Sequence, residues 1–214
     1  MPGTPHHDVA VEVRDLTVGY ERGKPVLDRF SADIGWGVVL VQGANGTGKS
    51  TLLEACSGYL PPWHGSVTVA GHDAASPAAR TRRRVCRTRQ SLYPTMTVRD
   101  HLAFAARSLR SDFEVALERA HGYGLEPWLD HEAQALSTGN SRKLWVILCT
   151  LGSFDVVLLD EPFNGLDESA ADVLQQDVQR WGRDGAVLLI AHTPPADLVP
   201  AQTVTVHAGA TLAA

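Results

Sequence analysis

The sequence has no apolar run long enough to cross a membrane. None of its hydrophobic stretches reaches the roughly 18 to 20 residues that a membrane-spanning helix requires. The first eight residues also lack the apolar core of a secretory signal. We therefore expect a chain that does not insert into a membrane by itself and does not enter the secretory route.

Cysteine is scarce as well, with three residues in 214 and no CxxC pair. This favours a reduced, cytosolic setting in which Cys56 and Cys149 pack as small hydrophobic side chains. His192 apart, the histidines show no metal-ligand spacing. A composition of 44% hydrophobic and 20% charged residues excludes a collagen-like or wholly disordered chain.

What the sequence does contain is an alternation of apolar strands with helical segments. Apolar runs at 38–41, 156–159 and 187–190 are typical of strands buried on both faces of a sheet. Residues 9–18 alternate between apolar and polar side chains with a one-residue slip, which predicts a half-buried strand. Together these patterns predict an α/β fold with a mainly parallel sheet and a small N-terminal antiparallel β layer.

The block from about 92 to 151 predicts an all-helical insertion. Thr97 precedes Asp100 by three residues, and Ser111 precedes Glu114 by three, so two capped helix starts are expected. A third helix is expected from about 140 to 151, closed by Gly152.

A complete phosphate-binding motif lies between the strand at 38–41 and a helix that starts at Lys49. Its sequence, GANGTGKS over residues 43–50, matches GxxxxGK[ST] in full. Glycines let the backbone wrap closely around a phosphate, and successive N–H groups at a helix N-terminus attract an anion. Lys49 is expected to reach the β- and γ-phosphates and Ser50 to ligate Mg²⁺. The expected nucleotide contacts from this segment are Gly43, Asn45, Gly46, Thr47, Gly48, Lys49, Ser50 and Thr51.

Two later strands deliver polar side chains to the same edge of the predicted sheet. Asp160 and Glu161 follow the run at 156–159, where Asp160 is expected to hold Mg²⁺ and Glu161 to act as general base on the attacking water. His192 ends the run at 187–190. Parallel strand order would bring it to the same edge, so we interpret it as a γ-phosphate contact rather than as a structural histidine.

Further motifs, taken with these, resemble the ATPase subunits of ABC transporters. Residues 136–140, LSTGN, are similar to the LSGGQ signature motif, and DEP at 160–162 followed by NGLD at 164–167 resembles the Walker B and D-loop segments. Ala191 and His192 resemble the H-loop, and Tyr20 stands where the family has an adenine-stacking aromatic residue. The resemblance runs from about residue 9 to residue 207.

The resemblance implies a P-loop NTPase (RecA-like) core, which also carries the antiparallel β layer, and an inserted α-helical subdomain. The whole chain, 1–214, is expected to be one nucleotide-binding domain, with its core at about 1–91 and 152–214 and its helical part at about 92–151. It also implies a head-to-tail homo- or heterodimer in which Ser137 and Gly139 of one subunit close on the ATP of the other. Thr138 and Asn140 depart from the signature. We expect a working site because Ser137 and Gly139 are retained, while a degenerate member of a heterodimer stays open.

The family's Q-loop glutamine is less clearly placed by the sequence. Counting forward from the strand around Val85 places it at Gln90, whereas counting back from residues 92–94 places it nearer Thr88. A loop shortened by two residues reconciles the two counts, so Gln90 is our expected contact to Mg²⁺ and water.

An arginine run is the one concentration of charge in an acidic chain, whose formal net charge is −5. The favoured interpretation is a solvated, positively charged face. The alternatives are contact with an acidic loop of a membrane subunit or with anionic lipid, and nucleic-acid binding. Against nucleic-acid binding, no recognised nucleic-acid module accompanies the run. The run comprises Arg80, Arg82, Arg83, Arg84, Arg87 and Arg89.

The leading functional hypothesis is an ATP-hydrolysing subunit that binds ATP and Mg²⁺ and powers a small exporter-type ABC transporter. We expect a separate transmembrane permease subunit, since one nucleotide-binding domain accounts for the length. The chain would then be cytoplasmic and peripheral on the inner face of the cell membrane. The alternatives are a soluble ABC ATPase in assembly or nucleic-acid processing, and a catalytically weak regulatory partner subunit.

Overall fold

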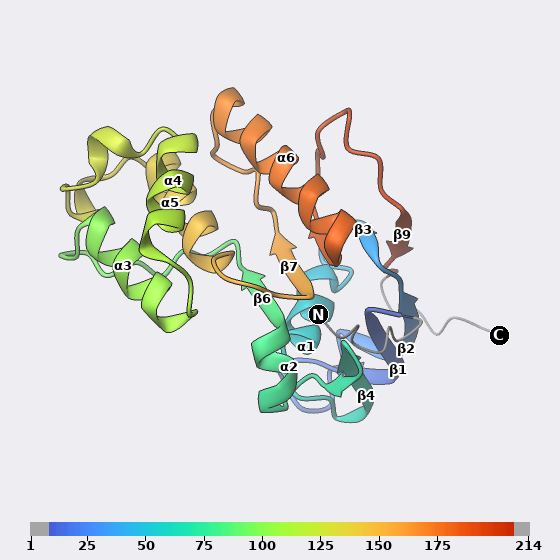
Figure 1. Ribbon diagram of the computed structural model, residues 1–214. Helices are drawn as coiled ribbons and strands as arrows, with labels where there is room; N and C mark the ends of the chain where they lie inside the picture. Colours follow the sequence, from blue (N-terminus) through green and yellow to red (C-terminus); the bar gives the residue numbers. More distant parts are fainter. Residues whose placement is uncertain (1–8, 208–214) are drawn as a thin grey trace.

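A computed structural model describes residues 9–207 as two β-sheets with helices around them and a helical lobe at one end (Figure 1). Residues 1–8, where the sequence predicts no secretory signal, lie outside the described residues. The strands are β1 (Val11–Val18), β2 (Leu27–Ile34), β3 (Gly37–Gln42), β4 (His64–Val69), β5 (His72–Asp73), β6 (Arg83–Cys86), β7 (Val156–Asp160), β8 (Ala186–Ile190) and β9 (Gln202–Thr205). The helices are α1 (Lys49–Cys56), α2 (Pro77–Arg82), α3 (Val98–Ser108), α4 (Phe113–Gly122), α5 (Thr138–Cys149) and α6 (Glu168–Asp184), with short 3₁₀ turns η1 (Glu126–Trp128) and η2 (Ala133–Ala135).

The antiparallel layer is a four-stranded sheet with the order β2-β1-β4-β5. The slip predicted in its first strand is confirmed, because the pairing of β1 with β2 shifts register between Val13 and Leu16. Asp15, inside that shift, has a φ of +48°. The bulge keeps apolar side chains on one face of β1 across the irregularity.

The second sheet has five parallel strands in the order β6-β7-β8-β3-β9. Both of its faces are covered, and β7 shows this directly. Val156 and Leu158 pack into the core shared with the antiparallel layer and α1, whereas Val157 and Leu159 pack into the core beneath α6 and the helical lobe. The α/β fold with a parallel sheet and an antiparallel layer is therefore confirmed, as the uninterrupted apolar runs predicted.

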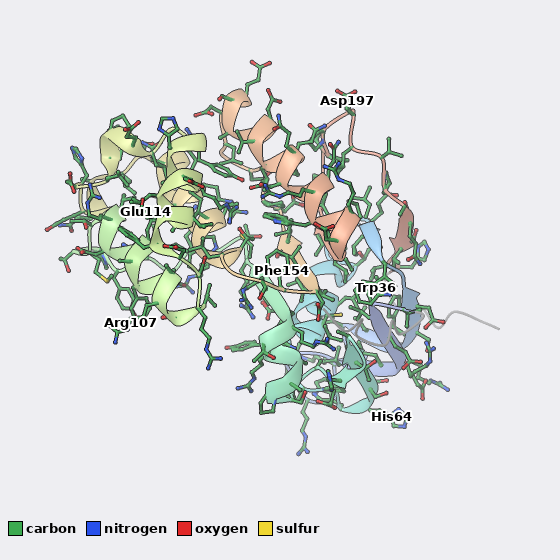
Figure 2. All side chains as sticks on the ribbon, viewed as in Figure 1. Trp36, His64, Arg107, Glu114, Phe154 and Asp197 are labelled. Atoms are coloured by element: carbon green, nitrogen blue, oxygen red, sulfur yellow. The ribbon has the colours of Figure 1, made fainter. Side chains whose placement is uncertain are left out.

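The helical lobe consists of α3, α4 and α5 (Figure 1). Thr97 and Asp100 form the predicted capping box at the start of α3. The predicted cap at Ser111 is wrong, since Asp112 is the residue that caps α4, accepting a hydrogen bond from the N–H of Glu114. Helix α5 starts at Thr138, two residues before the expected start. A ring contact joins the loop before β7 to α6, where Phe154 meets Trp181 edge-on. Phe154 is labelled in Figure 2.

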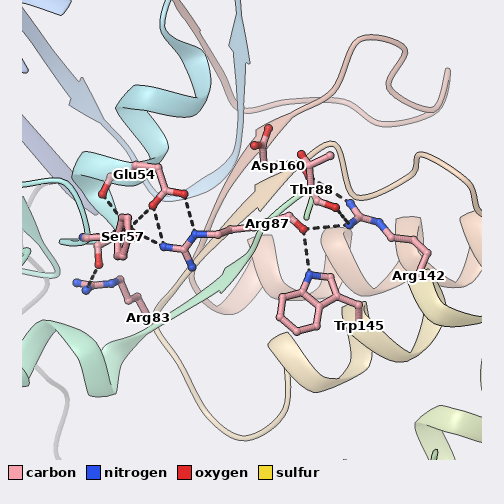
Figure 3. Close-up of polar contacts among 9 residues, drawn as sticks. Glu54, Ser57, Arg83, Arg87, Thr88, Arg142, Trp145 and Asp160 are labelled. Atoms are coloured by element: carbon pink, nitrogen blue, oxygen red, sulfur yellow. Dashed lines mark hydrogen bonds and ion pairs between the residues drawn. The ribbon is translucent and has the colours of Figure 1, made fainter. Parts of the chain in front are cut away.

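The arginine run is not a solvated face, so that prediction is wrong for four of its six members. Arg83 is 6% exposed and donates to the carbonyls of Ala74 and Ser57. Arg87 pairs with both oxygens of Glu54 at 2.7 and 2.8 Å (Figure 3). Arg82 pairs with Asp155, and Arg84 donates to the carbonyl of Leu151. These side chains join α1, α2 and β6 to the loops around them, and of the six only Arg80 and Arg89 are exposed.

Candidate functional site

A cavity of about 470 Å³ lies where β3, β7 and β8 end. Because the three strands are parallel, their carboxyl ends meet at one edge of the sheet, as the sequence predicted. The lining residues are Tyr20, Val26, Asn45, Gly46, Gly48, Lys49, Ser50, Thr51, Thr88, Asp160, Glu161, Ile190 and His192.

The glycines of the phosphate loop are required by its backbone path. Gly43, Gly46 and Gly48 have φ values of +151°, +78° and +105°. A Cβ at Gly43 would lie 2.3 Å from the carbonyl oxygen of Val206, and a Cβ at Gly48 would lie 2.8 Å from Leu27. No other residue type fits these two positions without displacing its neighbours.

The loop presents positive charge and an uncapped helix start. Lys49 extends its ammonium group back along the loop, where it donates to the carbonyls of Gly43 and Ala44 at 2.8 and 2.9 Å. Thr47 is buried and donates to the carbonyl of Ala44 at 2.9 Å, which holds the loop in shape. Helix α1 starts directly after Gly48, which has no side chain to cap the first-turn N–H groups. These groups are the donors that an anion would use.

Glu161 is held in an uncommon conformation beside this loop. Its φ is +48°, its N–H donates to the carbonyl of Ile190 at 2.9 Å, and its side chain is 12% exposed. Oε2 accepts the backbone N–H of His192 at 3.2 Å. Oε1 is buried and accepts no hydrogen bond from any described residue, although the His192 imidazole lies 3.6 Å away. A buried carboxylate oxygen without a donor is a strong acceptor site for a water molecule.

The residues present fit a nucleotide together with a divalent ion. Within residues 9–207, histidine, cysteine and carboxylate side chains do not gather in threes, so such side chains do not form a metal cage by themselves. Ser50 and Asp160 both line the cavity, and a hydroxyl with one carboxylate suits Mg²⁺ bound partly through phosphate oxygens and water. Tyr20, 66% exposed at the rim, presents a ring on which a base could stack.

The structure brings most of the predicted site residues together at the cavity, whereas Gly43 and Thr47 belong to the loop without lining the cavity. In the described part of the chain, Gln90 does not line the cavity, whereas Thr88 does. The Thr88 hydroxyl donates to the carbonyl of Asp160 at 3.2 Å. Counting back from residues 92–94 was the signal that pointed to Thr88. The role of Gln90 as a contact to Mg²⁺ and water stays a prediction.

Ser137 and Gly139 lie outside this cavity, at the start of α5. Ser137 is exposed and caps the helix by accepting the N–H of Asn140 at 3.1 Å. A Cβ at Gly139 would lie 3.1 Å from the carbonyl oxygen of Gly165, so the signature segment and the loop before α6 are in contact.

An ion pair fastens the same two segments. Lys143 pairs with Asp167 at 2.6 Å, and Asp167 also caps α6 by accepting the N–H of Ala170. The Lys143 ammonium, followed by this helix cap, holds the pKa of Asp167 below its usual range.

Comparisons with known proteins match most of this chain. A family model described as ABC transporter matches residues 28–164. The chain belongs to this family. The mouse ATP-binding cassette sub-family A member 7 is 34% identical over 202 residues, which are 89% of this chain, and the ABC transporter ced-7 of Caenorhabditis elegans is 33% identical over 159 residues, which are 72% of it. The chain spans 9% of the length of each of these two relatives.

A solved structure of the ATP-binding subunit of an ABC transporter matches with a TM-score of 0.83 at 26% identity, covering 93% of this chain and 86% of that one. The P-loop NTPase core predicted for this ABC ATPase is thereby confirmed. Membership of the family implies ATP binding and ATPase activity. Among residues 9–207, no helix of this ABC ATPase combines the length and the hydropathy that a bilayer crossing requires.

Proposed function

We propose that this chain hydrolyses Mg²⁺-bound ATP to power an exporter-type ABC transporter. The observation that carries the proposal is the meeting of two features in one cavity. One is the glycine loop at the start of α1, whose first-turn N–H groups receive no side-chain cap, and the other is the buried Oε1 of Glu161, which accepts no hydrogen bond from the described residues. A site with only the first feature would bind phosphate, whereas the second adds a base beside it.

Each residue has a role that follows from its place. Tyr20 stacks on the base, the loop from Gly43 to Thr51 holds the phosphates, and Lys49 turns its ammonium from the loop carbonyls to the phosphate oxygens. Bound Mg²⁺ would supply positive charge to those oxygens, held from the protein side by Ser50 and Asp160. Glu161 accepts a proton from water at Oε1, and His192 orients the carboxylate.

The site is completed by a second ATPase subunit. Ser137 and Gly139 lie at an exposed helix start away from the cavity of their own chain, which is where a head-to-tail neighbour could use them. Their contact with the loop at Gly165 makes both segments parts of one surface. The same arrangement serves a homodimer or a heterodimer.

The membrane-spanning part of the transporter is a separate permease subunit, and the ATPase is cytoplasmic and peripheral on the inner face of the cell membrane. The support is the similarity to a solved structure described as the ATP-binding subunit of an ABC transporter. Co-expression with candidate permeases, followed by purification in detergent, tests this partner. A chain that retains nucleic acid in high salt and joins no permease would contradict the transporter assignment and favour the soluble alternative.

Glu161→Gln tests the hydrolytic site. The amide cannot accept the proton, so the turnover of ATP should fall by about 10²- to 10⁴-fold. ATP affinity, measured with a fluorescent ATP analogue, should stay within about threefold because the phosphate loop is untouched. Glu118→Gln, on the exposed face of α4, is the matched control and should leave both quantities unchanged. Undiminished turnover in Glu161→Gln would remove Glu161 as the base.

A further inference from the structure

Arg142, in the second turn of α5, is a buried cation held by main-chain oxygens alone. It is 2% exposed and is among the largest fully buried side chains of the protein. Within residues 9–207 it forms no ion pair, and its guanidinium donates instead to five backbone carbonyls. The acceptors are Arg87 at 3.0 Å, Thr88 at 3.1 Å, Asp160 at 3.2 Å, Glu161 at 2.6 Å and Pro162 at 3.3 Å.

These five carbonyls belong to the two loops that line one side of the nucleotide cavity. Thr88 comes from the loop after β6, and Asp160 and Glu161 come from the end of β7. Figure 3 shows the Arg142 side chain reaching from its helix toward Thr88 and the backbone near Asp160. A single guanidinium therefore fixes the distance between the two loops.

The shortest of these hydrogen bonds is accepted by the carbonyl of Glu161, the residue with positive φ. A non-glycine residue with positive φ costs roughly 1 kcal/mol or more and persists only where its surroundings hold it. The Glu161 peptide is held on both sides, through its N–H by Ile190 at 2.9 Å and through its carbonyl by Arg142 at 2.6 Å. Removing the guanidinium frees one side, and the carboxylate then loses its fixed direction into the cavity.

We propose that Arg142 is a positioning residue for ATP hydrolysis, which sets the backbone of Glu161 and the spacing of its loop from Thr88. The inference rests on the proposed role of Glu161 as the base. Arg142 does not line the cavity, so it acts on the reaction through Glu161 and not on the nucleotide.

Arg119 provides a matched control in the same helical lobe. Its side chain is 14% exposed, and it donates to the carbonyl and hydroxyl of Thr150 and pairs with Asp177 at 3.0 Å. Like Arg142 it is largely buried and makes several polar contacts, but its partners belong to neither cavity loop. Arg142→Gln and Arg119→Gln should both lower Tm, whereas only Arg142→Gln should lower kcat, by about 100-fold. The Kd for a fluorescent ATP analogue should stay within about threefold in both.

Arg142→Lys should recover part of the kcat, because an ammonium group can still donate to the Glu161 carbonyl but cannot span all five acceptors. In the Glu161→Gln background, Arg142→Gln should cause no further loss, since a positioning residue has nothing left to position. If Arg142 were purely structural, the kcat of the double variant would fall by the product of the two single-variant losses.

An equal loss of kcat in the Arg142 and Arg119 variants would overturn the proposal, and so would independent losses in the double variant. If Arg142→Gln does not fold, Arg142→Lys serves in the same comparison, and an unchanged kcat there overturns the proposal. Glu161→Gln distinguishes a failure of the proposed function from a failure of the role proposed for Arg142. If that variant is active, the proposed function fails, but if it is inactive while Arg142→Gln turns over normally, only this inference fails.

Discussion

Glu161 meets His192 at two points of different kinds. One carboxylate oxygen accepts the backbone N–H of His192 at 3.2 Å, and the other lies 3.6 Å from the imidazole Nε2. The first contact uses the main-chain N–H of His192, so it remains when the imidazole is replaced. The imidazole is therefore only one of two groups of His192 that hold the Glu161 carboxylate.

His192→Ala should accordingly cost less than Glu161→Gln. It removes the imidazole but leaves the backbone N–H on Oε2, so we expect kcat to fall by about tenfold, the effect of one weak polar contact. Steady-state ATP turnover of the two variants measures the difference. Equal losses would contradict a main-chain hold on Glu161.

Thr88→Val and Gln90→Ala compare the two candidates for the loop after β6. The Thr88 hydroxyl lies at the cavity and donates to the Asp160 carbonyl, whereas Gln90 does not line the cavity in the described chain. We expect Thr88→Val to lower kcat more than Gln90→Ala at a fixed Mg²⁺ concentration. The opposite order would support Gln90 as the contact to Mg²⁺ and water.

Ser137→Arg and Ser137→Ala separate helix capping from dimer closure. Both remove the cap on the Asn140 N–H, and both should lose about 1 kcal/mol of stability. Only the arginine adds bulk at the exposed helix start, so only Ser137→Arg should abolish ATP-dependent dimerisation in the Glu161→Gln background. Light scattering during size-exclusion chromatography measures the mass, and equal dimerisation of both variants would count against the signature assignment.

The Lys143–Asp167 pair predicts a pH dependence. Because the pKa of Asp167 is lowered in the folded state, its stabilising contribution is complete above the ordinary aspartate pKa of about 4 and is lost as pH falls through the lowered value. Lys143→Met should raise the pKa of Asp167, which NMR titration of the carboxylates would show. Asp130, whose pKa is lowered by Arg99, should keep its titration and is the internal control.

The sequence predicts the central elements well because their physics is local. The strands β3, β7 and β8 are continuous apolar runs, and the phosphate loop is a contiguous motif whose glycines are needed by its own backbone. The capping box at Thr97 is equally local, since both of its members lie within four residues.

The unpredicted elements lack such local signals. In β2 the buried residues Leu27, Phe30 and Ile34 do not alternate strictly, because β1 and β2 shift register twice along their pairing. The strand β9 buries only Val204 fully, and α2 has six residues, of which only Ala79 is buried.

The arginines show the same limit for side chains. Arg83 and Arg142 look like surface residues in the sequence, and their carbonyl partners lie 9 to 55 positions away along the chain. Only the folded chain reveals that these cations are internal.

Arg87 has a mechanical consequence for the two helices that start at the nucleotide motifs. Its side chain is fixed to Glu54 on α1, and its carbonyl oxygen accepts from both Arg142 and Trp145 on α5. The helix behind the phosphate loop and the helix behind the signature segment are thus linked in series through one residue. A displacement of α1 or of α5 would therefore be transmitted to the other helix through Arg87. A displacement of the loop after β6 would act on both helices.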